Sequence, residues 1–254
     1  MEYVSLDEII KAKGLRLVLV QGMPSPWGQA AKTMFEMKGV PYMVAPQIPG
    51  APNDDLVAWS GQGSGPVVAW EGEAPINHWL DILFLAERIA PAPSLIPKDV
   101  SARALMIGLS HEICGELGIG WSRRLMLFRP AMEMDDPPDN MKIMAARYRY
   151  DFGEADKAAE RTADIVRAFA KQLASQKAKG SDYLVGQSVT ALDVYWVAFM
   201  NLLKPYGDNI VPIPPDFRPG FEGIGPVIEA ALDDTLIQHR DAIFSAHFRS
   251  PMEY

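Results

Sequence analysis

Ser25 is the residue whose position in the sequence best suits it for chemistry. It follows a β-rich run over residues 15–20 and directly precedes Pro26, a favourable first residue of a helix, so Ser25 is the predicted N-cap. The N-terminus of a helix carries a partial positive charge, and a serine hydroxyl can donate a hydrogen bond. Together these two groups can stabilise an anion. The alternative interpretation is that Ser25 only caps its helix.

Three other segments contain residue types that occur in catalytic or binding sites. His111-Glu112 begins like the helix of a zinc protease, but Gly115 stands where the second histidine is required, so we expect no metal site. Cys114 is interpreted as a small packed side chain, with a catalytic thiol as the less favoured alternative. The glycine-rich tract 61–65 is followed by neither Lys-Ser/Thr nor a helix, which excludes a nucleotide-binding loop.

Strands and helices alternate in the first 90 residues, and they are the elements that must position Ser25. Apolar residues at helical spacing after Pro26 predict a helix that ends near Gly39. The same reasoning predicts a short helix capped by Ser5 and reaching Lys13, strands over 15–20, 40–45 and 66–70, one helical turn over 54–58, and a helix from Asn77 to about Ala90. The order is a β-α-β unit followed by β-β-α.

The remainder of the sequence has almost no strand signal. Three prolines in the stretch 91–99 mark a boundary, so we predict one domain over 1–92 and a second over 100–254. Helices are expected over 101–127, 139–179, 191–203 and 226–246, and a proline-rich tract over 205–225 is expected to lie on the surface.

Composition is that of an ordinary globular protein. Hydrophobic residues make up 48% and charged residues 22%, which excludes a disordered chain, and the net charge of −8 disfavours nucleic acid as a ligand. A single cysteine excludes an internal disulfide and suits a reducing compartment, so we expect a cytoplasmic protein. No apolar run approaches about 18 residues, and Glu2 stands where a secretory signal needs a basic residue, so we expect neither export nor a membrane span.

Four motifs in this order resemble the glutathione S-transferase superfamily of the cytosolic, serine type. They are Ser25-Pro26-Trp27, Gly65-Pro66-Val67-Val68, the segment Asn77 to Arg88, and the run Tyr183 to Asp193 with a predicted Thr190/Asp193 capping box. The resemblance spans nearly the whole chain. It implies the glutathione S-transferase fold, which is a thioredoxin-like N-terminal domain followed by an all-helical C-terminal domain.

The resemblance also implies that glutathione is a co-substrate whose thiol Ser25 activates. Trp27 and a cis bond between Gly65 and Pro66 would complete the cysteinyl part of the site, with the Gly65 backbone exposed for pairing. Members of the superfamily hold the γ-glutamyl end with an acidic residue and a serine, whereas this chain has Asn77 and His78. We therefore expect weakened glutathione binding. Asp81 either joins these two residues in a polar cluster or, as the slightly favoured interpretation, lies exposed.

In the superfamily the electrophile binds between the two domains. By resemblance, Met23, His111, Cys114 and Trp121 line this pocket together with Trp27 and Glu116, and the set predicts a small apolar electrophile. Arg123 and Arg124 could neutralise an anionic substrate, although arginine pairs on helices are usually solvated.

Three functions remain open at this point. The first is a glutathione transferase, the second is a non-catalytic scaffold of the same fold that binds glutathione weakly, and the third is a glutathione-dependent isomerase or lyase. The resemblance further implies a homodimer.

Overall fold

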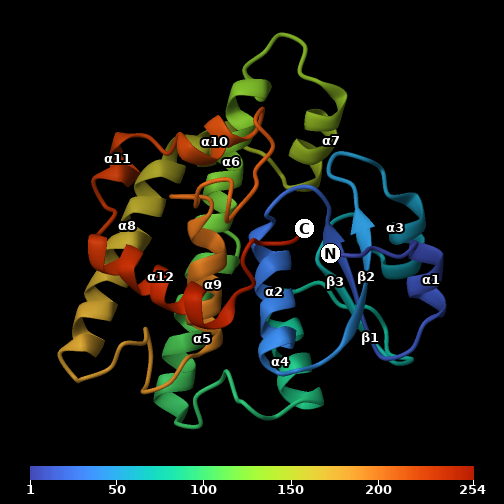
Figure 1. Ribbon diagram of the computed structural model, residues 1–254. Coiled ribbons are helices and arrows are strands. Elements are labelled where there is room, and N and C mark those ends of the chain that lie inside the picture. Colours follow the sequence, from blue (N-terminus) through green and yellow to red (C-terminus); the bar gives the residue numbers. More distant parts are fainter.

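A three-stranded sheet forms the centre of the N-terminal half of the protein (Figure 1). The computed structural model describes residues 1–254. Strand β1 (Leu15–Val20) lies in the middle, parallel to β2 (Tyr42–Gln47) and antiparallel to β3 (Val67–Trp70). A single antiparallel bridge between Val68 and Ile76 follows β3 in place of a full fourth strand.

Both faces of β1 are buried because its side chains alternate between two layers of helices. Leu15, Leu17 and Leu19 pack with α2 (Pro26–Met37) and α4 (Trp79–Ile89). Val18 faces the other side and packs with α1 (Leu6–Lys11) and α3 (Asp54–Ser60). This explains why apolar residues stand at both alternating sets of positions in β1, with Arg16 as the exception.

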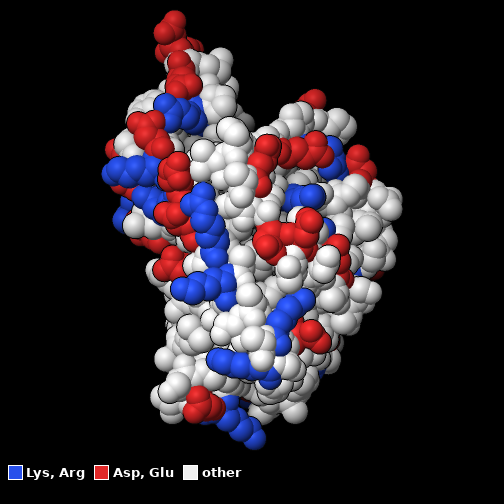
Figure 2. Space-filling view, turned by 90° about the vertical axis from the view of Figure 1, so that its left-hand side faces the viewer, with Lys and Arg blue, Asp and Glu red and all other residues white.

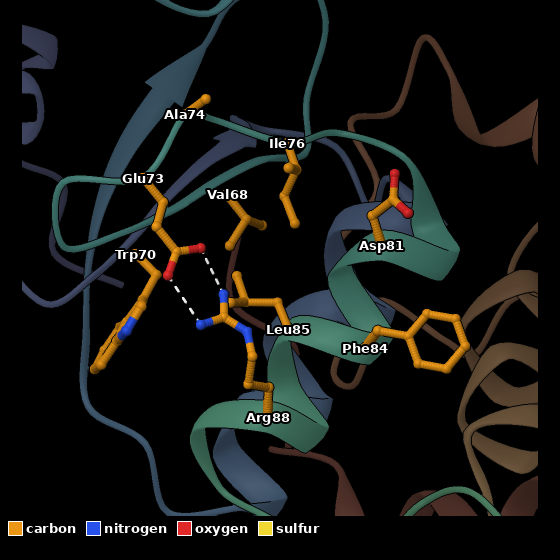
Figure 3. Close-up of a pocket in the computed structure, with 9 residues that line it drawn as sticks. All are labelled: Val68, Trp70, Glu73, Ala74, Ile76, Asp81, Phe84, Leu85 and Arg88. Carbon is orange, nitrogen blue, oxygen red and sulfur yellow. Dashed lines mark hydrogen bonds and ion pairs between the residues drawn. The ribbon is translucent and has the colours of Figure 1, made fainter.

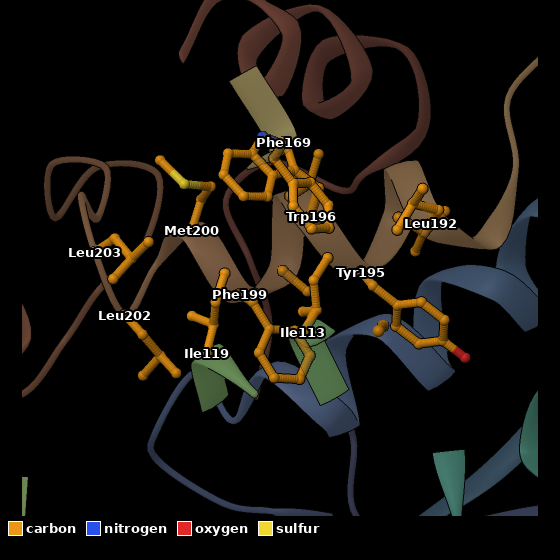
Figure 4. Close-up of a cluster of buried hydrophobic side chains, with 14 of the residues drawn as sticks. Ile113, Ile119, Phe169, Leu192, Tyr195, Trp196, Phe199, Met200, Leu202 and Leu203 are labelled. Atoms are coloured by element: carbon orange, nitrogen blue, oxygen red, sulfur yellow. The ribbon is translucent and has the colours of Figure 1, made fainter. Parts of the chain in front are cut away.

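Every element after α4 is a helix. The bounds are α5 (Val100–Cys114), α6 (Ile119–Met132), α7 (Asp139–Arg147), α8 (Phe152–Lys177), α9 (Ala191–Met200), α10 (Arg218–Glu222), α11 (Pro226–Glu229) and α12 (Asp234–His247). All ten residues of α9 are buried, and Trp196 of α9 stacks on Phe169 of α8 with ring centroids 5.1 Å apart (Figure 4). Helix α9 is therefore the centre of the helical half.

The two halves share one hydrophobic core. Ala30 and Met34 of α2 and Leu83 of α4 belong to the same buried cluster as α9, and the three helices lie side by side in Figure 1. The observed architecture is the expected one, a thioredoxin-like sheet domain followed by an all-helical domain. Because α2 packs on both the sheet and α9, its N-terminus is fixed relative to both halves.

Three of the predicted long helices are interrupted in the structure. The helix expected over 101–127 divides into α5 and α6 at a tight turn, where a Cβ on Gly118 would lie 2.6 Å from the backbone oxygen of Glu112. The helix over 139–179 divides into α7 and α8, and Asp151 caps the second part through the backbone N–H of Glu154. The helix over 226–246 divides before Asp233, which caps α12 in the same way.

Two capping boxes are present, and the one at Thr190 and Asp193 was predicted, whereas Ser5 was predicted only as a cap. Ser5 and Glu8 exchange hydrogen bonds at the start of α1. At the start of α9 the carboxylate of Asp193 accepts from the backbone N–H and the hydroxyl of Thr190, at 2.8 and 2.9 Å. In the predicted box the Thr190 hydroxyl accepts from the backbone N–H of Asp193. In the structure this hydroxyl donates to the Asp193 carboxylate.

Basic and acidic side chains intermingle on the face shown in Figure 2. The charges on this face therefore largely offset one another. Elsewhere in the structure, ion pairs join neighbouring turns of α8, such as Arg167 with Asp164 at 2.8 Å and Lys157 with Glu154 at 3.1 Å. No helix combines the length and the apolar character that crossing a bilayer requires.

Candidate active site

Ser25 is the N-cap residue of α2, as predicted, but its hydroxyl does not cap the helix. Its backbone oxygen accepts the N–H of Gln29 at 2.9 Å, and its own N–H donates to the oxygen of Met23 at 2.8 Å. The side chain makes no hydrogen bond within the protein, although the residue is partly buried. The predicted bond from the helix backbone to the hydroxyl is thus absent, and Oγ is free both to donate and to accept.

The peptide bond between Gly65 and Pro66 is cis, as the resemblance implied. Gly65 lies against the carboxyl end of β1, where a Cβ would stand 3.0 Å from the oxygen of Val18 and 3.3 Å from the nitrogen of Val20. No backbone hydrogen bond involves Gly65. Its N–H and C=O are therefore available at the end of the sheet from which the chain continues to Ser25.

Helix α4 begins at Trp79, two residues later than predicted, and His78 is its N-cap residue. The Asn77 side chain donates from Nδ2 to Oε1 of Gln62 at 2.8 Å. His78 Nδ1 lies 3.9 Å from the carboxylate of Asp81, and both side chains are more than half exposed. Asp81 is thus exposed, as the favoured interpretation held, and the alternative cluster with Asn77 does not form.

Trp27 fastens the start of α2 to the helical domain. Its Nε1 donates to the backbone oxygen of Cys114 at 3.0 Å, and its ring meets Phe199 edge to face with centroids 4.8 Å apart. A Cβ on Gly120 would lie 2.6 Å from the Trp27 ring, so only glycine permits this approach. Because Trp27 is two residues from Ser25, this packing also positions the serine.

The side chains expected to line the electrophile pocket differ in their surroundings. Met23 and Trp121 are partly buried, and Met23 packs against the main core. Cys114 is buried within that core, and burial raises the pKa of its thiol well above the usual value, so the thiol stays protonated. His111 is exposed and lies near Trp79, with ring centroids 6.4 Å apart. Glu116 is also exposed.

The two arginines of α6 have opposite environments. Arg123 is buried and donates to the backbone oxygens of Leu202 and Gly220, at 2.8 and 2.9 Å, so it has a structural role. The side chain of Arg124 makes no hydrogen bond and no ion pair within the protein. Its guanidinium carbon lies 4.5 Å from the ring centroid of Trp27 and 3.8 Å from that of Tyr148.

Sequence reasoning missed three residues of this region, namely Gln62, Arg147 and Tyr148. Arg147 connects the helical domain to the sheet domain, because its Nη1 donates to the oxygen of Gly63 at 2.8 Å. No motif marks these residues, since each acts on a partner at least 15 positions away in the sequence. No group of three or more His, Cys, Asp or Glu side chains is arranged to hold a metal ion.

Comparison with known proteins rests on structure alone, because neither a family model nor a curated protein matches the sequence. A glutathione S-transferase from Methylobacterium radiotolerans, in complex with glutathione sulfonate, is 16% identical with a TM-score of 0.61, and the match covers 92% of this chain and 91% of that one. A rice glutathione S-transferase in complex with glutathione is 18% identical with a TM-score of 0.61, covering 94% and 93%.

A beta-etherase from a Sphingobium strain is also similar, at 17% identity and a TM-score of 0.58, with 90% of this chain and 99% of that chain covered. At such low identity these likenesses establish the fold and not the reaction. The chain has the glutathione S-transferase fold.

Proposed function

We propose that this protein is a glutathione transferase in which Ser25 activates the thiol. The observation that carries the proposal is the Ser25 hydroxyl, which has no partner in the protein and stands at the N-terminus of α2. A free cysteine thiol has a pKa of about 8.5, and lowering it by two units requires about 2.7 kcal/mol. A hydroxyl donated to the thiolate supplies about 1.5–3 kcal/mol, and a helix N-terminus adds about 0.3–1 kcal/mol.

The residues around Ser25 fit the remainder of a tripeptide thiol. The unpaired N–H and C=O of Gly65 suit the cysteinyl backbone, which would extend the sheet edge by two hydrogen bonds. The start of α4 offers free backbone N–H groups, with Asn77 and His78 beside it, to a carboxylate. Similar structures that contain glutathione or its sulfonate support this assignment.

The second substrate is a small electrophile with an apolar body. Trp27, Met23 and Trp121 supply apolar and aromatic surface next to Ser25, and we assign His111 and Cys114 to the outer and inner parts of the same region. The thiol proton passes to solvent as the thiolate forms. The thiolate sulfur then attacks the electrophilic carbon, the C–S bond forms, and the leaving group departs to solvent with the electron pair of the bond that breaks. An ether-cleaving or isomerising reaction would use the same activated thiol and would differ only in this second substrate.

Replacing Ser25 tests the proposal directly. With a chloronitroaromatic electrophile, Ser25→Ala should lower kcat/KM by about 10- to 100-fold, which corresponds to the loss of one charge-assisted hydrogen bond. The rising limb of the pH profile should move to higher pH, because the thiol of bound glutathione loses its stabilisation as a thiolate. Ser25→Thr keeps the hydroxyl and is the matched control. Unchanged turnover in Ser25→Ala would falsify the role of this serine.

One observation favours a second function, a scaffold that binds glutathione weakly and is not catalytic. Asn77 carries no charge, and its amide is already hydrogen-bonded to Gln62, so the γ-glutamyl end loses the acidic partner found in the superfamily. Calorimetric titration with glutathione distinguishes the two functions. Micromolar affinity supports the transferase, whereas millimolar or undetectable binding supports the scaffold.

The proposed protein consists of domains 1–92 and 100–254 and works in the cytoplasm as a homodimer. The break between α4 and α5 supports the boundary, and the single, unpaired cysteine suits a reducing compartment. For the dimer, α4 and α5 present large apolar side chains to solvent, including Phe84, Val100 and Leu105. Phe84 also borders a cavity of about 280 Å³ between β3 and α4, and it points away from the Glu73–Arg88 ion pair (Figure 3).

A further inference from the structure

Arg124 differs from the other arginines of the protein in its combination of burial and missing partners. The side chain of every other arginine except Arg149 makes at least one hydrogen bond within the chain, and Arg149 is exposed. Arg124 is partly buried on α6, yet no carboxylate and no backbone oxygen accepts from it. A guanidinium carries five N–H donors, so donors of Arg124 are left for a group outside the chain.

Aromatic rings hold the Arg124 guanidinium in a fixed place. It lies 3.8 Å from the ring centroid of Tyr148, 4.5 Å from that of Trp27 and 5.6 Å from that of Trp121. Contacts of this kind hold the guanidinium against the aromatic rings, and no group of the protein accepts a hydrogen bond from its N–H donors. Burial lowers the pKa of Arg124, and no acidic residue of the protein pairs with the cation.

The position of Arg124 relative to Ser25 follows from a chain of contacts. Trp27 is two residues from Ser25 on α2, or about 3 Å along the helix axis, and its ring contacts Arg124. Tyr148 also contacts Arg124, and the neighbouring Arg147 donates to Gly63 in the loop that leads to the cis bond. Helices α6 and α7 stand at the end of the molecule where α2 begins (Figure 1).

We propose that Arg124 binds a carboxylate on the second substrate, so that the protein takes small aromatic or apolar electrophiles that carry an acidic group. The planar guanidinium matches a carboxylate in two parallel hydrogen bonds, and the flanking Trp27 and Trp121 rings supply apolar surface for the body of the same molecule. This inference rests on the proposed function, because it names the substrate class of that site. Arg123, which is saturated by backbone oxygens, takes no part.

A matched pair of electrophiles tests the inference. In 4-chloro-3-nitrobenzoate and its methyl ester, the glutathione sulfur attacks the ring carbon that bears chlorine, the C–S bond forms, the C–Cl bond breaks, chloride leaves and the thiol proton passes to solvent. Arg124→Met should raise KM for the acid by about 10- to 100-fold, as expected for a lost charge-assisted pair. The kcat for the acid and the KM for the ester should not change. Arg124→Lys keeps the positive charge but lacks the two parallel N–H donors. Its KM for the acid should therefore lie between those of the wild type and Arg124→Met.

Arg149→Met is the control, because it removes the same charge from an exposed arginine of the same domain whose side chain makes no hydrogen bond. It should affect neither substrate. If Arg124→Met weakens acid and ester equally, Arg124 serves only packing and the inference is wrong. An unchanged KM for the acid overturns it as well.

Binding without turnover separates this inference from the proposed function. Calorimetric titration with 3-nitrobenzoate and its methyl ester, which have no leaving group, should show tighter binding of the acid, and Arg124→Met should abolish the difference. One outcome is that the wild-type protein binds 3-nitrobenzoate more tightly than its ester and yet converts neither 4-chloro-3-nitrobenzoate nor its methyl ester. In that case the transferase function is wrong and the acid site is supported. If wild-type protein binds acid and ester equally, the acid site is refuted whatever the activity.

Discussion

Gly65 shows how one residue can connect the fold with the proposed chemistry. A side chain at this position would meet the backbone of β1, whose atoms cannot move aside as a flexible side chain can. The absence of a side chain therefore lets the loop approach the sheet, and the same approach leaves the Gly65 backbone groups exposed for a ligand.

Gly65→Ala should consequently lower both stability and ligand affinity. We expect a loss of about 1–3 kcal/mol in the free energy of unfolding, from the overpacked contact with Val18 and Val20, and weaker glutathione binding because the backbone groups move. Gly72→Ala is the control, since no heavy atom lies within 4 Å of the added Cβ. Urea unfolding and glutathione titration of both variants measure the effects, and equal stability of the two variants contradicts the steric argument.

At this scale the sequence predicted residues whose roles depend on local geometry. Ser25 next to Pro26 is the N-cap residue. The cis bond before Pro66 was implied by the family resemblance and not by local geometry. The sequence could not separate Arg123 from Arg124, because neighbouring arginines look alike until their partners are known. Those of Arg123 are 79 and 97 positions away in the chain. Only the tertiary structure shows which of the two has no acceptor.

Among the elements, the start of α9 holds a buried carboxylate that organises several segments. Asp193 is fully buried, accepts the N–H of Leu184 at 2.9 Å and the N–H of Thr190 at 2.8 Å, and lies 3.1 Å from Nε2 of His239 on α12. The capping box predicted from the sequence is thus part of a larger polar network that joins α9, α12 and the loop before α9.

Asp193→Ala should destabilise the protein far more than the loss of an ordinary cap. We expect about 3–5 kcal/mol, because buried donors of Leu184 and Thr190 would lose their acceptor. Asp233→Ala removes the exposed cap of α12 and should cost about 1 kcal/mol. Urea unfolding followed by circular dichroism compares the two variants. Similar losses in both would show that the buried network adds nothing to capping.

Element types were predictable and several boundaries were not. Strand β1 has the predicted limits because its apolar run ends in clear turn residues. The long helices of the second half were predicted without their interruptions, since an apolar pattern continues across a short break when both parts face the same core. The signals were present in Asp151 and Asp233, which are good N-cap residues within the predicted helices.

On the scale of the whole molecule, the shared core makes the two halves one body. Helix α2 lies between the sheet and α9, so the site at its N-terminus is built from both halves and depends on their relative placement. Trp27 from the first half and Arg124 from the second meet only because of this docking. The separate contribution of each half was predictable from the sequence, but the contact was not, because it joins residues almost 100 positions apart.

The exposed apolar faces of α4 and α5 lead to a prediction about assembly. A stable dimer buries about 1,200–2,000 Å² in total around a few large apolar side chains, and Phe84, 45% exposed, is the largest on these two helices. Phe84→Asp should convert the proposed dimer to a monomer, because dimerisation would bury an unpaired carboxylate. Phe217→Asp, at a position 52% exposed and outside these helices, is the control. Light scattering after size-exclusion chromatography gives the masses. A monomeric wild-type protein would contradict the proposed dimer, and a Phe84→Asp variant that remains dimeric would place the interface elsewhere.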